Sequence, residues 1–164
     1  MEMTANAAAW LLIAALPISV FVAWNDMRAM KIPNVAVGAL VLAFAVLGLI
    51  AFPFPTYLWQ WTHLVVVLVI GFVLNAAGVL GAGDAKFAAA AAPFVLLGDL
   101  VVLAWVFIAC VITGFITHRI AMHSPLRRLV PEWESWTAGR RFPMGLPLGM
   151  TLVFYLLLAL TQNW

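Results

Sequence analysis

Long apolar runs joined by short polar connections make up almost the whole chain. A helix that crosses the hydrocarbon core of a bilayer needs about 20 mostly apolar residues. Six runs approach this length, and we expect each to form a helix. The runs are Ala7–Trp24, Val35–Phe52, Thr62–Leu80, Asp84 or Ala85 to Leu97, Leu100–Thr117 and Phe142–Leu160. The pattern therefore predicts an all-α fold, a polytopic membrane bundle of six transmembrane helices.

The fourth run is too short for a full span. From Asp84 to Leu97 a helix would measure about 21 Å, whereas the hydrocarbon core is about 30 Å thick. Tilt, local thinning of the bilayer or a start recessed inside the membrane could make up the difference, and the glycine-rich hinge Gly81-Ala82-Gly83 fits a recessed start. Backbone that is not helical is tolerated at that depth where it lines protein or water. The pattern thus predicts that Asp84 lies in a cavity reached by water.

Composition supports this interpretation and narrows the class of protein. Hydrophobic residues make up 66% of the chain and charged residues only 9%, whereas soluble domains carry about a quarter charged residues. We expect one integral membrane domain, residues 1–164, and no nucleic-acid partner, because the basic residues lie in short loops. The single Cys110 lies inside an apolar run, which excludes an internal disulfide and a cysteine-based zinc site.

The distribution of basic residues predicts the topology. All eight lysines and arginines lie on the same side of the expected bundle, seven in connections one and five and Lys86 at the junction of the third and fourth runs. They are Arg28, Lys31, Lys86, Arg119, Arg127, Arg128, Arg140 and Arg141. Cytoplasmic loops of membrane proteins carry an excess of such residues. The connections bearing Asp26 and Asp84 are therefore predicted to be cytoplasmic, with both termini outside.

The longest connection, residues 119–141, mixes basic residues with leucine and tryptophan. One interpretation is a segment that lies in the headgroup layer and contacts anionic lipid. The other is a simple basic anchor that fixes the topology. The sequence leaves both open.

Asp26 and Asp84 are the candidate catalytic groups. An ionisable side chain within a membrane segment is a functional candidate by default, and the predicted topology puts both at one face of the bundle. Two carboxyl groups close together share a proton, so the charged one can activate water while the neutral one protonates a leaving nitrogen. We expect Asp84, at a helix start, to be the ionised one. This chemistry requires no metal and no cofactor.

Other interpretations remain. Asp84 could merely cap a helix, and Asp26 could be a charge beside the membrane partnered with Arg28. Broken helices with carboxylates also build ion sites in transporters, and a non-catalytic assembly factor is a further alternative. Gly98-Asp99 is predicted to be a tight turn at the outer side.

Three motifs carry a resemblance to a known family. Gly81-Ala82-Gly83-Asp84-Ala85-Lys86 resembles the GxGDxK signature of the type IV prepilin peptidases. Asp26-Met27-Arg28 followed by Ile32-Pro33-Asn34 resembles the family's first aspartate motif. Arg141-Phe142-Pro143-Met144-Gly145 resembles the Pro-x-Gly pattern that opens its last helix. The motifs occur in the family's order along nearly the whole chain.

The resemblance implies a membrane aspartic endopeptidase of the bacterial inner membrane with Asp26 and Asp84 as its catalytic pair. It implies removal of a short basic leader from prepilin or pseudopilin substrates, at the cytoplasmic face. The size of the chain is similar to the short Tad/Flp-pilus peptidases of the CpaA/TadV type, which lack a methyltransferase domain. The residues expected to support the site or bind substrate are Gly81, Gly83, Lys86, Arg28, Asn34, Pro143 and Gly145.

Overall fold

The computed structural model describes residues 1–139 and 141–161. Within these residues the chain forms α-helices and short 3₁₀ turns, and no strand. The α-helices are α1 (Ala5–Ala29), α2 (Asn34–Ala51), α3 (Phe54–Ala76), α4 (Ala82–Ala91), α5 (Leu100–His123) and α6 (Gly145–Thr161). The 3₁₀ turns are Ala92–Phe94, Leu97–Asp99, Pro125–Leu129 and Glu134–Trp136. The predicted all-α fold is confirmed.

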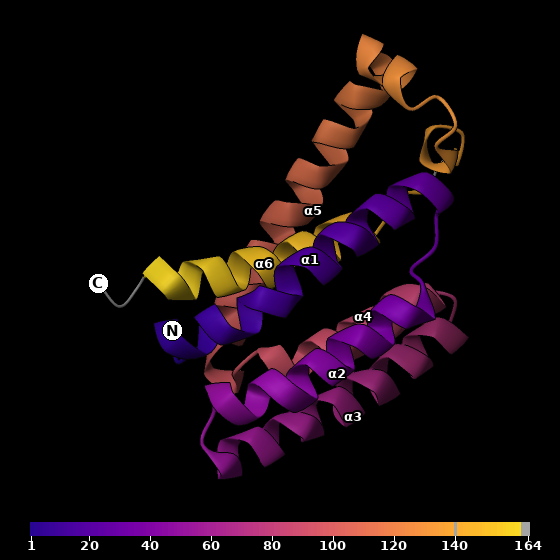
Figure 1. Cartoon of the computed structure of the whole chain (residues 1–164). Helices are drawn as coiled ribbons and strands as arrows, with labels where there is room; N and C mark the ends of the chain where they lie inside the picture. Colours follow the sequence, from indigo (N-terminus) through magenta and orange to yellow (C-terminus); the bar gives the residue numbers. More distant parts are fainter. Residues whose placement is uncertain (140, 162–164) are drawn as a thin grey trace.

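The helices pack in an order that differs from their order along the chain. Helix α1 packs along α6 and also against α2, while α4 packs against α2 and α3, and α5 packs against α6. The N-terminus lies at the same end of the bundle as the α2–α3 connection, and the α1–α2 and α3–α4 connections lie at the opposite end (Figure 1). Helices distant in sequence therefore bring their ends together.

Among the described residues, four helical stretches are long and apolar enough to cross a membrane. They are α1, α2, α3 and the segment Leu97–His123. Helix α4, with 10 residues, extends only about 15 Å, and α6, with 17 residues, about 26 Å. The helical membrane bundle is thus confirmed, with a short fourth helix, and α6 is also shorter than a full span.

Helices α1 and α5 end later than predicted, at Ala29 and His123, so Asp26 lies within a helix, and the boundaries of α3 and α4 also differ from the prediction. Helix α3 begins at Phe54 instead of Thr62, because a proline is tolerated in the first turn of a helix, and Pro55 stands there. Its early part is packed, since the buried Gln60 side chain donates hydrogen bonds to the carbonyls of Pro93 and Val95 at 2.8 and 2.9 Å. Helix α4 ends at Ala91 instead of Leu97, because Pro93 has no N–H to continue the ladder.

Asp99 lies in a turn, as predicted, but it is buried. Its carboxylate accepts hydrogen bonds from the backbone N–H of Glu2 at 2.6 Å and of Met3 at 3.0 Å. The Tyr155 hydroxyl also donates to it, at 2.8 Å. Asp99 therefore fixes the N-terminal segment and α6 at the end of the bundle that carries the N-terminus.

Candidate active site

One cavity of about 660 Å³ lies between three connections of the chain. These are the α1–α2 connection, the α3–α4 connection and the segment just before α6. Asp26 and Asp84 both line it, although they come from different helices. The structure therefore brings the two predicted carboxylates to one cavity.

Asp26 lies in the last two turns of α1 and is only 5% exposed. Its Oδ2 accepts a hydrogen bond from the backbone N–H of Gly145, at 2.6 Å. Gly145 is the first residue of α6, so the carboxylate takes up one of the N–H groups that a helix start leaves without an internal partner. A Cβ on Gly145 would lie 2.8 Å from the Asp26 Cβ. Only glycine allows this approach, which gives the Pro-x-Gly motif a physical role.

Asp84 lies in the first turn of α4, which begins at Ala82, two or three residues earlier than predicted, so that Ala82 and Gly83 of the expected hinge are helical. Its carboxylate folds back onto the helix start and accepts a hydrogen bond from the N–H of Gly81. A Cβ on Gly81 would lie 2.5 Å from Oδ2 of Asp84. A Cβ on Gly83 would instead meet the Ile32 side chain at 3.4 Å, an ordinary contact. The first glycine of the hinge thus leaves space for the carboxylate, and the second faces the α1–α2 connection.

Burial and charge both act on Asp84, which is not part of the four stretches long enough to span a membrane. Its pKa is raised to about 6, first because burial removes the carboxylate from water and second because the Asp26 charge is close. The hydrogen bond from Gly81 offsets part of this rise. Because the Asp26 charge contributes to this value, Asp84 keeps its proton up to about pH 6 beside an ionised Asp26, the reverse of the assignment expected from its position at a helix start.

Two asparagines that sequence reasoning did not select hold the connections in place. The Asn25 side chain donates to the carbonyl of Lys31, at 2.6 Å, across the α1–α2 connection. The Asn75 side chain donates to the carbonyl of Leu80, at 2.8 Å, across the α3–α4 connection. Asn25 directly precedes Asp26, and this adjacency was the signal available in the sequence.

Lys86 and Asn34 form a polar link between α4 and α2. The Lys86 Nζ donates to Oδ1 of Asn34 at 3.3 Å, and both residues are exposed and line the cavity. Arg28 is placed elsewhere, because its guanidinium lies over the Trp24 ring, 5.2 Å from the ring centroid. Arg28 is not among the residues that line the cavity.

Pro143 is buried, and its carbonyl accepts the N–H of Leu146 at 3.3 Å, so it starts α6 without lining the cavity. Of the expected supporting residues, Gly81, Gly83, Lys86 and Asn34 line the cavity, while Gly145 contacts Asp26 directly.

Arg140, which the topology prediction used, lies outside the described residues. Across residues 1–139 and 141–161, no three histidine, cysteine or acidic side chains gather where they could hold a metal ion.

Comparison with known proteins gives the family. The model of the "Type IV leader peptidase family" matches residues 8–118, more than half of the chain. The match includes Asp26 and Asp84 and ends before Pro143. A search of curated proteins and a search of solved structures found no match. On the family match, and in agreement with the motifs around the cavity, this chain belongs to the type IV leader peptidase family.

Proposed function

We propose that this chain is an aspartic endopeptidase that removes a short basic leader from prepilin-like substrates, and that residues 1–164 act as a single membrane domain. The family supplies the class, a peptidase with prepilin-type substrates. One observation supports the aspartic mechanism above all others: Asp26 and Asp84, from different helices, line the same cavity.

The chemistry follows from the surroundings of the two carboxylates. The ionised Asp26 takes a proton from a water held between the two acids, and the resulting hydroxide attacks the peptide carbonyl. Asp84, which keeps its proton beside the Asp26 charge, polarises that carbonyl and then gives its proton to the leaving nitrogen. Because Gly145 occupies one oxygen of Asp26, the other oxygen takes up the proton of the water in this scheme. A nucleophilic side chain and a bound metal are not needed.

The proposal includes a location and an orientation. Three basic residues line the cavity, namely Lys31 in the α1–α2 connection, Lys86 near the start of α4 and Arg141 in the segment before α6. The positive-inside tendency then puts the cavity at the cytoplasmic face of a bacterial inner membrane, with both termini outside. The leader of the substrate would stay in the cytoplasm, and its apolar helix would lie in the bilayer.

The direct test is cleavage by the purified full chain in nanodiscs. The substrate is a prepilin of the Flp type, which the likeness to the short Tad/Flp peptidases favours. Mass spectrometry is expected to show a product that begins just before the apolar helix. A transporter or a non-catalytic assembly factor would leave the substrate intact. An intact Flp-type substrate together with a cleaved substrate of another pilus type would refute only the Tad/Flp subtype.

The raised pKa of Asp84 predicts an alkaline limit to activity. As pH rises through about 6, Asp84 loses the proton that the leaving nitrogen needs. We expect kcat to fall about tenfold for each pH unit well above that value. No histidine lies among the described residues that line the cavity, so a histidine of the site cannot produce this limit. A rate that is constant from pH 7.5 to 4.5, with a substrate that has no titratable group near the cut bond, would contradict the assignment.

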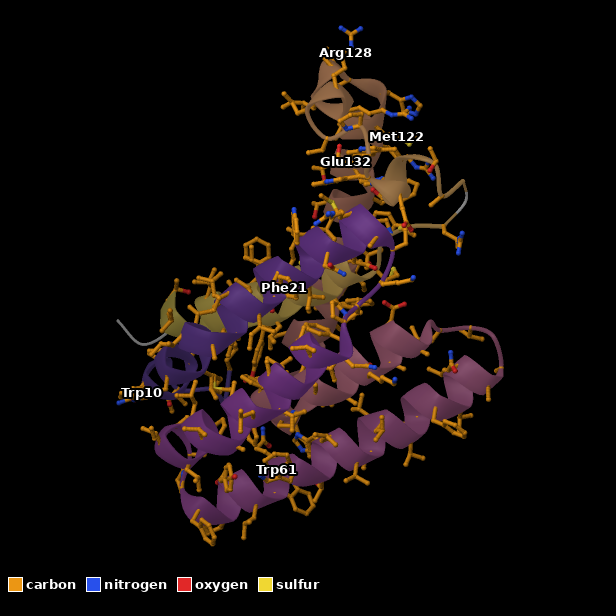
Figure 2. The ribbon with its side chains drawn as sticks, turned by 45° about the vertical axis from the view of Figure 1, so that its right-hand side comes forward. Trp10, Phe21, Trp61, Met122, Arg128 and Glu132 are labelled. Atoms are coloured by element: carbon orange, nitrogen blue, oxygen red, sulfur yellow. The ribbon has the colours of Figure 1, made fainter. Side chains whose placement is uncertain are left out.

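We further propose that residues 125–136 contact anionic lipid. Leu126 and Leu129 are 56% and 77% exposed beside the exposed Arg127 and Arg128, and Arg128 extends away from the bundle (Figure 2). Basic residues near an anionic surface each contribute about 1 kcal/mol of attraction. Anionic nanodiscs are expected to slow hydrogen exchange of this segment relative to neutral ones, and Arg127→Gln with Arg128→Gln should remove the difference. Equal exchange of the wild type in both lipids would refute the contact.

A further inference from the structure

A second hollow lies beside the active site, on the surface that α1 and α6 form together. It is a shallow groove of about 220 Å³, and its lining is apolar apart from Ser19. Small residues form part of it, namely Ser19 and Ala23 of α1 and Gly149 of α6. The two backbones are in close contact there, because a Cβ on Gly149 would lie 2.8 Å from the carbonyl oxygen of Ser19.

The groove begins one helical turn from the catalytic site. Ala23 lies one turn before Asp26 on α1, and Gly149 lies one turn after Gly145 on α6. From Asp26 the groove extends as far as Leu16, a distance of about 15 Å along α1. It therefore leads from the buried carboxylate toward the opposite end of the bundle, along a face with exposed apolar side chains such as Val20.

Ser19 gives the groove an unsatisfied polar group. The residue is 2% exposed, and its hydroxyl has no hydrogen-bond partner among the described residues. A buried hydroxyl normally has a partner, and in membranes serine often finds it on a neighbouring helix. A helix that enters the groove could supply an acceptor to this hydroxyl, whereas the acyl chain of a lipid could not.

We propose that this groove receives the apolar helix of the substrate, the segment that follows the cut bond. The inference rests on the proposed function, because it assumes a substrate whose helix enters the bilayer directly after the cleavage site. The leader and the cut bond occupy the cavity at Asp26, and side chains from one face of the substrate helix enter the groove. Val20 lies six residues before Asp26, so the substrate residue opposite it is about six positions after the cut bond.

Disulfide trapping tests this register. The full chain with Cys110→Ala and Asp84→Asn holds an uncut substrate, and Val20→Cys supplies the probe in the groove. The matched control is Val69→Cys on α3, since Val69 is 57% exposed and Val20 is 59% exposed. They lie about 11 Å and about 14 Å from the cavity ends of their helices. Single cysteines are placed at successive positions of the substrate helix, and a mild oxidant is added.

With Val20→Cys, the yield of cross-linked product is expected to be highest for a substrate cysteine about six positions after the cut bond and to rise again every three to four positions. With Val69→Cys, no cross-link is expected. Equal trapping at both sites would overturn the proposal. So would disulfides between two copies of Val20→Cys that persist with substrate present, because the groove would then be a face between copies of this chain.

A second measurement separates this proposal from the proposed function. Ala23→Leu narrows the groove without touching either carboxylate, and Val69→Leu is its control. With a full-length substrate, Ala23→Leu is expected to lower kcat/KM by about tenfold or more, mainly through KM. With a short peptide that ends soon after the cut bond, it should have little effect. Unchanged cleavage of the full-length substrate would refute the groove alone, whereas a wild type that cleaves neither substrate would refute the proposed function.

Discussion

Replacing Asp84 or Asp26 with asparagine is expected to lower kcat for leader removal by about 10²–10⁴-fold. Asparagine has nearly the same shape but cannot take up or release the proton. In the wild type the N–H of Gly145 donates to Oδ2 of Asp26 at 2.6 Å, and the amide oxygen of an asparagine at position 26 can still accept this hydrogen bond. The loss should therefore appear in kcat, measured by mass spectrometry with purified variants in nanodiscs, and not in the amount of folded protein.

The structure offers a matched control for these variants in Asp99. This carboxylate is also buried and accepts several hydrogen bonds, but it lies at the other end of the bundle. Asp99→Asn should lower the unfolding temperature and leave kcat per folded molecule near the wild-type value. The double variant of Asp26 and Asp84 should be little worse than either single variant, because the two groups act as a unit. If Asp99→Asn reduced kcat as strongly as Asp84→Asn, the two-aspartate mechanism would be refuted.

The meeting of Asp26 and Asp84 at one cavity could be predicted from the sequence. Acidic residues are few in this chain, and an apolar environment makes each of them costly, so their positions are informative. The basic residues then suggested that both lie at one end of the bundle, and the short run after Asp84 suggested a helix that starts within the membrane. These inferences used only local composition and the thickness of a bilayer.

Contacts between distant segments could not be predicted in the same way. Nothing near Asp99 in the sequence indicates that Glu2 and Tyr155 bond to it. The early start of α3 depends on the bonds of Gln60 to the chain after α4, which exist only once both elements have packed. The sequence also allowed Arg28 to pair with Asp26, and only the folded structure shows that its guanidinium lies over the Trp24 ring.

Gly145→Ala is the variant that tests how the Asp26 carboxylate is held in position. The added Cβ would lie 2.8 Å from the Asp26 Cβ and 3.0 Å from its Oδ2, which is closer than such atoms normally approach. Either α1 and α6 move apart or the carboxylate turns away and loses its bond to the Gly145 N–H. Because a shift of about 1 Å can cost about 10²-fold in rate, we expect kcat to fall by about 10- to 100-fold. Overpacking should also destabilise the fold by about 1–3 kcal/mol.

Variants at two other glycines show whether kcat depends on the position of the Asp26 carboxylate or on the packing of α1 against α6. Gly38→Ala places a methyl group where nothing lies within 4 Å, so it should leave both stability and kcat near the wild type. Gly149→Ala crowds the same pair of helices, with its Cβ 2.8 Å from the Ser19 carbonyl oxygen, but one turn away from Asp26. It should therefore destabilise the protein about as much as Gly145→Ala does and affect kcat much less. If both variants lowered kcat equally, the spacing of α1 and α6 would control the rate, and the bond from Gly145 to Asp26 would have no separate role in catalysis.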